Sequence, residues 1–80
     1  MIVRSQNMHI ALRREEIRKT ELQHKDPDNV WLVVAITEDN RAITLARYPS
    51  EKEALSADNK MWLCKDEMYA YPVLSGKEGI

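Results

Sequence analysis

The sequence of 80 residues contains no phenylalanine and a single cysteine, Cys64. One cysteine excludes a disulfide within the chain and a zinc site built on several thiolates. Without phenylalanine, the core depends on two tryptophans, three tyrosines, four methionines and the aliphatic residues. A chain this short buries only roughly 60–65% of the surface that its unfolded form exposes, so it builds one core, and such domains often gain stability by self-association.

Glycine is scarce as well, because the two glycines, Gly76 and Gly79, both lie near the end of the sequence. Phosphate-binding loops need glycine where the backbone approaches the anion, so no P-loop and no dinucleotide-binding fingerprint is present. His9 and His24 have no carboxylate or thiol at the spacing of metal ligands. Cys64 lies on an apolar helical stripe, where a free cysteine acts as a small hydrophobe. We therefore expect no enzyme, no cofactor and no metal.

Long hydrophobic runs are also absent. The longest is residues 30–36, far below the roughly 20 residues that span a bilayer and typical of a buried strand. Arg4 and polar residues stand where a signal peptide needs an apolar stretch, so we expect a cytoplasmic protein without membrane association. The formal charge of −1 and the pI of about 6.1 argue against a dedicated nucleic-acid binder.

A junction between a strand and a helix lies at residues 48–53. Pro49 has no N–H to donate and favours an extended residue before it, so a strand ends at about Tyr48. Ser50 and Glu53 form a capping box, in which each side chain binds the backbone N–H of the other residue. The apolar positions that follow have the 3-4-3 spacing of one helical face: Ala54, Ala57, Met61 and Cys64. The pattern predicts a helix over about 51–64.

Alternation and turn residues predict about five short strands among six candidate segments. Residues 30–37 form the central strand, since they are apolar on both faces, and residues 42–48 form its hairpin partner. In that partner Ile43 and Leu45 share one face, with Ala46 on the other. The remaining strand candidates are residues 1–5, 9–12, 17–24 and 68–71. The turn at 26–29 carries proline, aspartate and asparagine, and the hairpin loop at 38–41 contains Asn40, which tolerates positive φ.

Two segments allow alternatives. Residues 11–24 are rich in helix formers, but their apolar residues are five apart, which fits neither a helical face nor a strand face. We interpret 13–16 as a connection and 17–24 as an edge strand whose charges prevent edge-to-edge aggregation. Residues 65–71 either extend the helix, because Met68 continues its stripe, or form a last strand.

Together these patterns predict an α+β fold. It consists of a mainly antiparallel sheet of about five short strands with the helix over about 51–64 packed on one face. We expect a single domain over residues 1–74 and a frayed tail over residues 75–80, because polar terminal segments are often poorly ordered.

Three stretches of the sequence stand out: the opening M-I-V-R-S-Q, the strand end Leu45-Ala46-Arg47-Tyr48, and the capped helix with Ser50 and Ala54-Leu55. Together they resemble a family of short uncharacterised proteins from Gram-positive bacteria and their phages. Members of that family also finish with a strand ending in proline, similar to residues 68–72. The sequence departs from the family at Ala46, where glycine is usual, and in a longer, more charged segment at 13–28. The resemblance implies strands before a single helix, a phage-related origin and no known activity.

Aromatic residues and methionine are the candidates for an interface, because both are enriched at interface centres. They are Trp31, Met61, Trp62, Met68, Tyr69 and Tyr71. Core filling is the alternative interpretation, since phenylalanine is absent. The leading hypothesis is a small non-enzymatic protein that binds another protein or itself, for example as a homodimer.

The second hypothesis is weak nucleic-acid binding by an accessory protein with a basic N-terminal face. Residues 1–25 contain six lysines and arginines against three acids. The candidate contacts are Arg13, Arg14, Arg18 and Lys19. This hypothesis requires those side chains on one face. A solvated charged surface is the alternative, because Glu15 and Glu16 interrupt the cluster.

Overall fold

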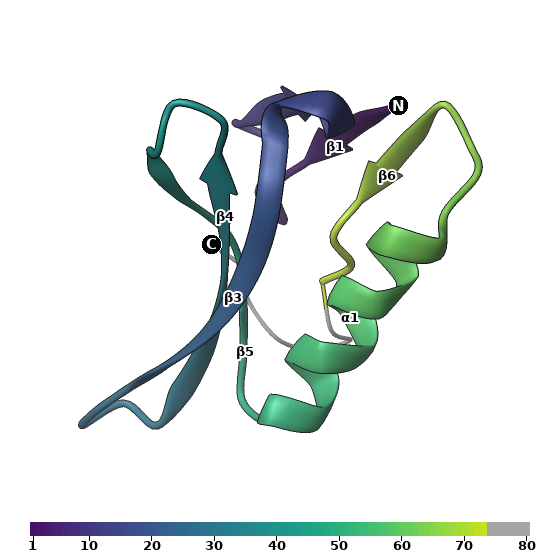
Figure 1. The fold of residues 1–80 in the computed structure, drawn as a ribbon. Helices are drawn as coiled ribbons and strands as arrows, with labels where there is room; N and C mark the ends of the chain where they lie inside the picture. Colours follow the sequence, from purple (N-terminus) through teal and green to yellow (C-terminus); the bar gives the residue numbers. More distant parts are fainter. Residues whose placement is uncertain (74–80) are drawn as a thin grey trace.

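The computed structural model describes residues 1–73, and in it six short strands form two three-stranded sheets (Figure 1). Sheet A has the order β2 (Ala11–Arg13), β1 (Ile2–Arg4) and β6 (Met68–Ala70). Sheet B has the order β3 (Ile17–Lys25), β4 (Val30–Thr37) and β5 (Ala42–Tyr48). The helix α1 (Glu51–Leu63) packs against sheet B, and the 3-10 turn η1 (Arg14–Glu16) connects β2 to β3.

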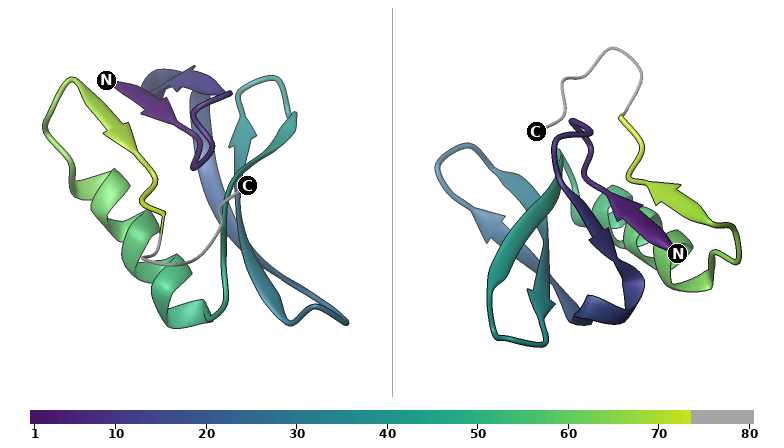
Figure 2. Two further views of the ribbon diagram at one scale, coloured as in Figure 1. Left: turned by 180° about the vertical axis from the view of Figure 1, so that it is seen from behind. Right: turned by 90° about the horizontal axis from the view of Figure 1, so that it is seen from above.

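The prediction of an α+β fold with mostly antiparallel strands and one helix is confirmed, but the strands divide between two sheets. Strand β1 pairs antiparallel with β2 and parallel with β6, so the two ends of the described chain meet in sheet A. Figure 2 shows this sheet lying over the C-terminal half of α1. Pairing between distant segments leaves no local sequence pattern, which is why one sheet was the simpler expectation. The expected tail over 75–80 lies outside the described residues.

The two segments for which the sequence allowed alternatives, residues 11–24 and 65–71, both contain strands. Residues 11–24 contain β2, η1 and all of β3 except Lys25, so the interpretation as a connection and an edge strand is right and helix propensity is overridden. The last segment forms β6 instead of extending α1, because the helix ends at Leu63 with Cys64 as its C-cap. At the turns, Asn29 and Asn40 both have positive φ, at 54° and 65°.

Helix α1 begins where the sequence predicts, but with only one of the two hydrogen bonds of the capping box. The Ser50 hydroxyl accepts a hydrogen bond from the Glu53 N–H at 3.3 Å. Within residues 1–73 no reciprocal hydrogen bond from the Ser50 N–H to the Glu53 carboxylate is found, and the buried Glu53 Oε2 has no hydrogen-bond partner there.

A β-bulge in β5 changes which side chains reach the core. Val33 pairs with Ala46 while Val34 pairs with Thr44, so Leu45 is an extra residue in the ladder. A bulge resets the alternation of faces, and Leu45 and Ala46 are therefore both fully buried. The sequence prediction placed Leu45 and Ala46 on opposite faces by simple alternation, and it is wrong because it did not include this bulge.

The core lies between α1 and the two sheets. The helix buries the predicted stripe Ala54, Ala57 and Met61 and, next to it, Asp58, while Cys64 is half-buried. The buried cluster also contains Tyr71, just after β6, and residues from both sheets: Val3, Leu12, Ile17, Val33, Ala35, Leu45, Ala46 and Tyr48. In the part of the chain that the structure describes, no helix is long and apolar enough to cross a membrane.

Candidate interaction surface

Two of the six predicted interface residues belong to the core. Met61 is 0% exposed and Tyr71 is 2% exposed, so neither side chain reaches the surface of the folded chain. Core filling, the alternative interpretation, is the correct one for these two positions. Tyr71 is buried because the parallel pairing of β1 with β6 brings it beside α1, where its hydroxyl donates to Asp58. Met61 is buried because it lies on the apolar face of α1 together with Ala54 and Ala57.

The two tryptophans are partly buried and have partners within the chain. The Trp62 Nε1–H donates to the Thr20 hydroxyl at 2.9 Å, and the Arg14 guanidinium lies 3.9 Å from the centre of the Trp62 ring. That distance is typical of a cation–π contact. Trp31 packs against His24, with ring centroids 4.8 Å apart. Both tryptophans thus hold sheet B and its neighbours together.

Asp58 is the centre of a buried polar network that the sequence analysis missed. Its carboxylate accepts hydrogen bonds from the Thr20 hydroxyl at 2.7 Å and from the Tyr71 hydroxyl at 2.8 Å. Burial, and then the proximity of Asp58, raise the pKa of Tyr71 above its usual value. Asp58 follows Ala54 by four residues and precedes Met61 by three, so the helical period placed it on the buried stripe.

Tyr69 is half-buried beside this network. Its hydroxyl donates to the Ala57 carbonyl at 2.7 Å, and its ring meets that of Tyr71 edge-on with centroids 5.3 Å apart. Burial raises the pKa of Tyr69 to about 12. Tyr69 therefore turns its side chain toward α1, and the neighbouring residues Met68 and Ala70 turn theirs to the other face of sheet A.

The four predicted nucleic-acid contacts each engage a different partner. Arg13 pairs with Glu16 at 3.6 Å, and Lys19 pairs with Glu21 at 3.1 Å. The Lys19 contact lowers the pKa of Glu21. Arg18 donates to the side chain of Asn40 at 2.7 Å, and Arg14 covers Trp62. Arg13 and Lys19 are thus paired with acids, whereas Arg18 contacts an amide and Arg14 contacts an aromatic ring.

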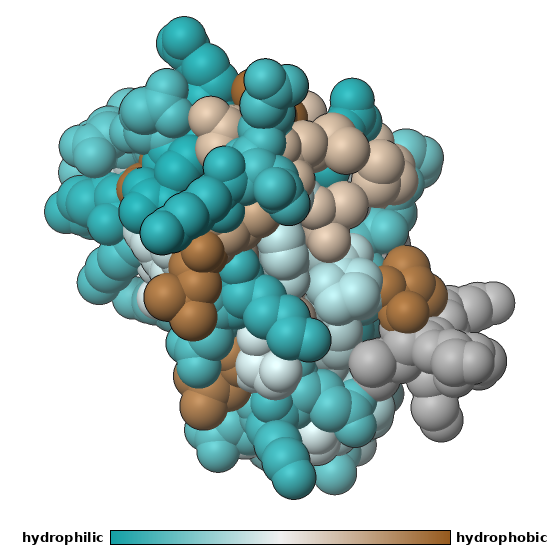
Figure 3. All heavy atoms as spheres, turned by 90° about the vertical axis from the view of Figure 1, so that its right-hand side faces the viewer, coloured by the Kyte–Doolittle hydropathy of each residue, from teal (hydrophilic) through white to brown (hydrophobic). Residues whose placement is uncertain are grey.

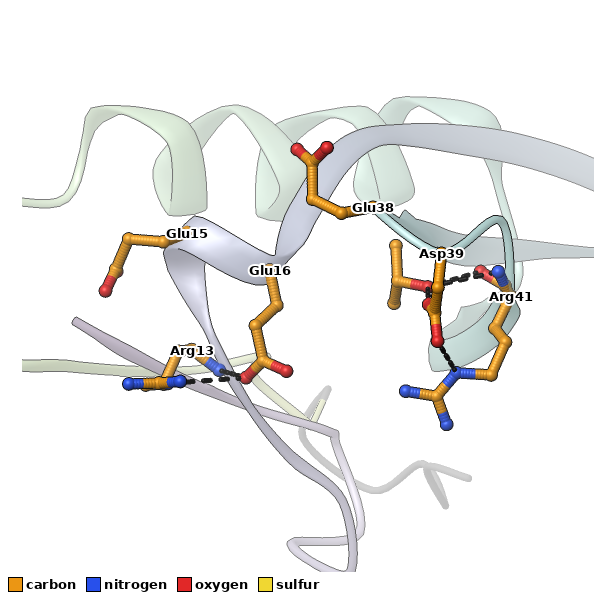
Figure 4. Close-up of a pocket in the computed structure, with 7 residues that line it drawn as sticks. Arg13, Glu15, Glu16, Glu38, Asp39 and Arg41 are labelled. Atoms are coloured by element: carbon orange, nitrogen blue, oxygen red, sulfur yellow. Dashed lines mark hydrogen bonds and ion pairs between the residues drawn. The ribbon is translucent and has the colours of Figure 1, made fainter.

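A polar hollow of about 380 Å³ lies between η1 and the turn that connects β4 to β5 (Figure 4). Asp39 accepts hydrogen bonds from Thr37 and Arg41, and these two contacts lower the pKa of its carboxyl group. Figure 4 shows Glu38 pointing away from the Arg13–Glu16 and Asp39–Arg41 pairs. Across residues 1–73, no group of three or more histidines, cysteines and carboxylates has the geometry of a metal site.

Strand β6 differs from the other edge strands in having no charged residue. Strand β3 carries charges and a bulge between Ile17 and Lys19, β2 carries Arg13, and β5 carries Arg47. Gln6 also covers part of β5, because its N–H donates to the Leu45 carbonyl and its side chain accepts from the Arg47 N–H. Charges and bulges are the usual protection of a sheet edge. Within residues 1–73 no strand pairs with the outer side of β6.

The backbone of β6 leaves a regular set of polar groups on its free edge. The Glu67 carbonyl accepts from the Ile2 N–H at 2.8 Å, and the Tyr71 N–H donates to the Arg4 carbonyl at 3.2 Å. Because successive residues of a strand point their backbone groups to opposite sides, Tyr69 also faces β1. The N–H and C=O groups of Met68 and Ala70 therefore face outward.

Apolar side chains accompany this free edge on the outer face of sheet A. Met68 is 49% exposed, Ala70 is half-buried, and Ile2 lies beside Met68 in the ladder. We call Ile2, Met68, Ala70 and the free edge of β6 the β6 surface. Figure 3 shows pale-brown side chains gathered in the upper part of the view, where β6 lies, while the rest of this face is mostly teal with separate brown groups.

Other exposed apolar residues lack such an edge. Leu55 and Leu63 are exposed, Leu63 at 78%, but they lie on α1 and not on the free edge of a sheet. Of the predicted interface residues, Met68 and Tyr69 lie in β6. Ile2 and Ala70 were missed because neither an isoleucine nor an alanine marks a surface by its type.

Comparison of the chain with protein-family models, with curated proteins and with solved structures finds no significant match.

Proposed function

We propose that this chain is a small non-enzymatic, cytoplasmic interaction module that docks protein through the β6 surface. The observation that carries the proposal is an edge strand without charge, beside an apolar side chain that is half exposed. An extended segment of a partner adds to such an edge through backbone hydrogen bonds, and its alternate side chains meet the face of the sheet. The proposal agrees with the predicted interface residue Met68, whereas Tyr69 lies in the same strand but turns its side chain toward α1.

Nucleic-acid binding remains the weaker hypothesis. Phosphate binding requires several cations that converge on a backbone, whereas Arg13, Arg14, Arg18 and Lys19 each contact a different group of the chain.

The proposal is tested by selecting ligands from a library of random displayed peptides and measuring their affinity for two variants. Met68→Lys places a charge on the β6 surface, and a charge on an edge strand disfavours its pairing with another strand. We expect selected peptides to be extended and apolar, and to lose at least about tenfold in affinity for this variant, or about 1.4 kcal/mol.

Leu63→Lys is the matched control, since it introduces the same charge in place of an apolar side chain that is more exposed but lies on α1. Its affinity for the selected peptides is expected to stay within about twofold of the unmodified chain. Equal losses in both variants, or a selection that yields no specific peptide, would refute the β6 surface as the docking site.

A further inference from the structure

We propose that the partner of β6 is the β6 strand of a second copy, paired antiparallel about Tyr69 to form a homodimer. This inference rests on the proposed function, because it names what the β6 surface binds. It would join the two copies of sheet A into one continuous sheet.

The outward backbone groups of β6 fit this arrangement. With Tyr69 opposite Tyr69, Met68 of each copy lies opposite Ala70 of the other. Met68 and Ala70 are the residues whose N–H and C=O groups face the free edge. In an antiparallel ladder, such opposed residues exchange two hydrogen bonds. Each β6 strand of the symmetric pair therefore uses all of its outward-facing N–H and C=O groups.

Neighbouring registers satisfy these groups less well. A register centred on Ala70 sets Met68 against Pro72, which has no N–H to donate. A register centred on Met68 sets Met68 against Met68 and draws Asp66 into the ladder, although Asp66 lies in a bend before the strand. Only the register about Tyr69 places a large side chain against a small one on the outer face and keeps charged residues out of the ladder.

Pairing with a second copy also covers the exposed β6 edge of both chains at once. The pairing is isologous, so each β6 edge covers the other and none is left to recruit a further chain. The β3 edge cannot substitute for it, because its bulge and its charges interrupt a regular ladder. The geometry therefore points to a closed dimer.

Disulfide trapping tests the register directly, in a chain where Cys64→Ser removes the native thiol. Met68→Cys and Ala70→Cys are prepared as two separate proteins, because these positions oppose each other only between copies. Opposed residues of a hydrogen-bonded pair are about 5.5 Å apart at Cα, which suits a disulfide. Two copies of position 68 lie diagonally at more than about 7 Å, which does not.

We expect mild oxidation of the mixture to yield at least about tenfold more covalent dimer than either protein alone, as measured on non-reducing gels and by mass spectrometry. Circular dichroism of each variant, compared with the unmodified chain, verifies folding. Sedimentation of the unmodified chain provides a measurement that needs no substitution, with a concentration-dependent monomer–dimer equilibrium as the expected result.

The outcomes separate the two proposals. Equal cross-linking by Met68→Cys alone would overturn the register about Tyr69. A monomer at all concentrations, with selected peptides that still depend on Met68, would overturn self-pairing and identify an extended segment of another protein as the partner. Selected peptides that ignore Met68→Lys would overturn the proposed function itself.

Discussion

Met61→Ala is expected to lower the free energy of unfolding by about 2–5 kcal/mol, the range for a buried methionine truncated in a core. The Met61 side chain is 0% exposed and belongs to the cluster that α1 forms with both sheets. A domain of this length has a total stability of roughly 4–12 kcal/mol, so the variant loses a large part of it. Urea denaturation followed by circular dichroism measures the change.

Leu63→Ala is the control on the same helix, because Leu63 lies two positions further along α1 and is 78% exposed. Exposed substitutions of this kind usually change the stability by less than about 0.5 kcal/mol. Similar losses in the two variants would mean that α1 does not present Met61 to the core, and would contradict the described packing of the helix.

Asp58→Ala is expected to destabilise the fold by about 2–5 kcal/mol. The change leaves the buried Tyr71 hydroxyl and the half-buried Thr20 hydroxyl without their acceptor, and a buried hydroxyl without a partner costs about 1–3 kcal/mol. Asp58→Asn keeps one acceptor oxygen and the shape of the side chain. We therefore expect it to lose about half as much as the alanine variant.

A double-mutant cycle separates this network from simple loss of packing. Tyr71→Phe removes one donor to Asp58 and keeps the ring. Because Tyr71→Phe already removes one of the hydroxyls that Asp58→Ala would leave unpaired, the combined variant is expected to lose about 1–3 kcal/mol less than the sum of the two single losses. Strict additivity would show that the 2.8 Å contact between Tyr71 and Asp58 contributes nothing to stability.

Local rules were sufficient for the elements whose determinants lie close together in the sequence. Ser50 and Pro49 mark the start of α1, and positive φ at Asn40 closes the hairpin between β4 and β5. The strand β3 was predicted as an edge because its charges are compatible only with solvent. In each case a few adjacent residues determine the conformation.

Non-local pairing explains what the sequence did not reveal. The bulge at Leu45 depends on the register between β4 and β5, and the parallel pairing of β1 with β6 joins segments more than sixty residues apart. The Asp58 network draws on α1, β3 and the segment after β6, so its three members carry no shared motif. For the same reason, Met61 and Tyr71 were interface candidates until the fold placed them inside.

The β6 surface shows how far residue types alone lead. Met68 and Tyr69 were selected as an aromatic and a methionine, and they do lie in the unprotected strand. What makes this strand a docking edge is the outward direction of the Met68 and Ala70 backbone groups. That direction follows from the hydrogen bonds at Glu67 and Tyr71, which only the sheet topology specifies.

Amide hydrogen exchange of residues 68–71 tests the central claim, the open edge of β6, most directly. In dilute solution we expect the Met68 and Ala70 amides to exchange at least about tenfold faster than those of Tyr69 and Tyr71, which face β1. Raising the protein concentration is expected to slow the first two and leave the others unchanged. Equal protection of all four amides in dilute solution would show that the edge is already covered, and would contradict the account.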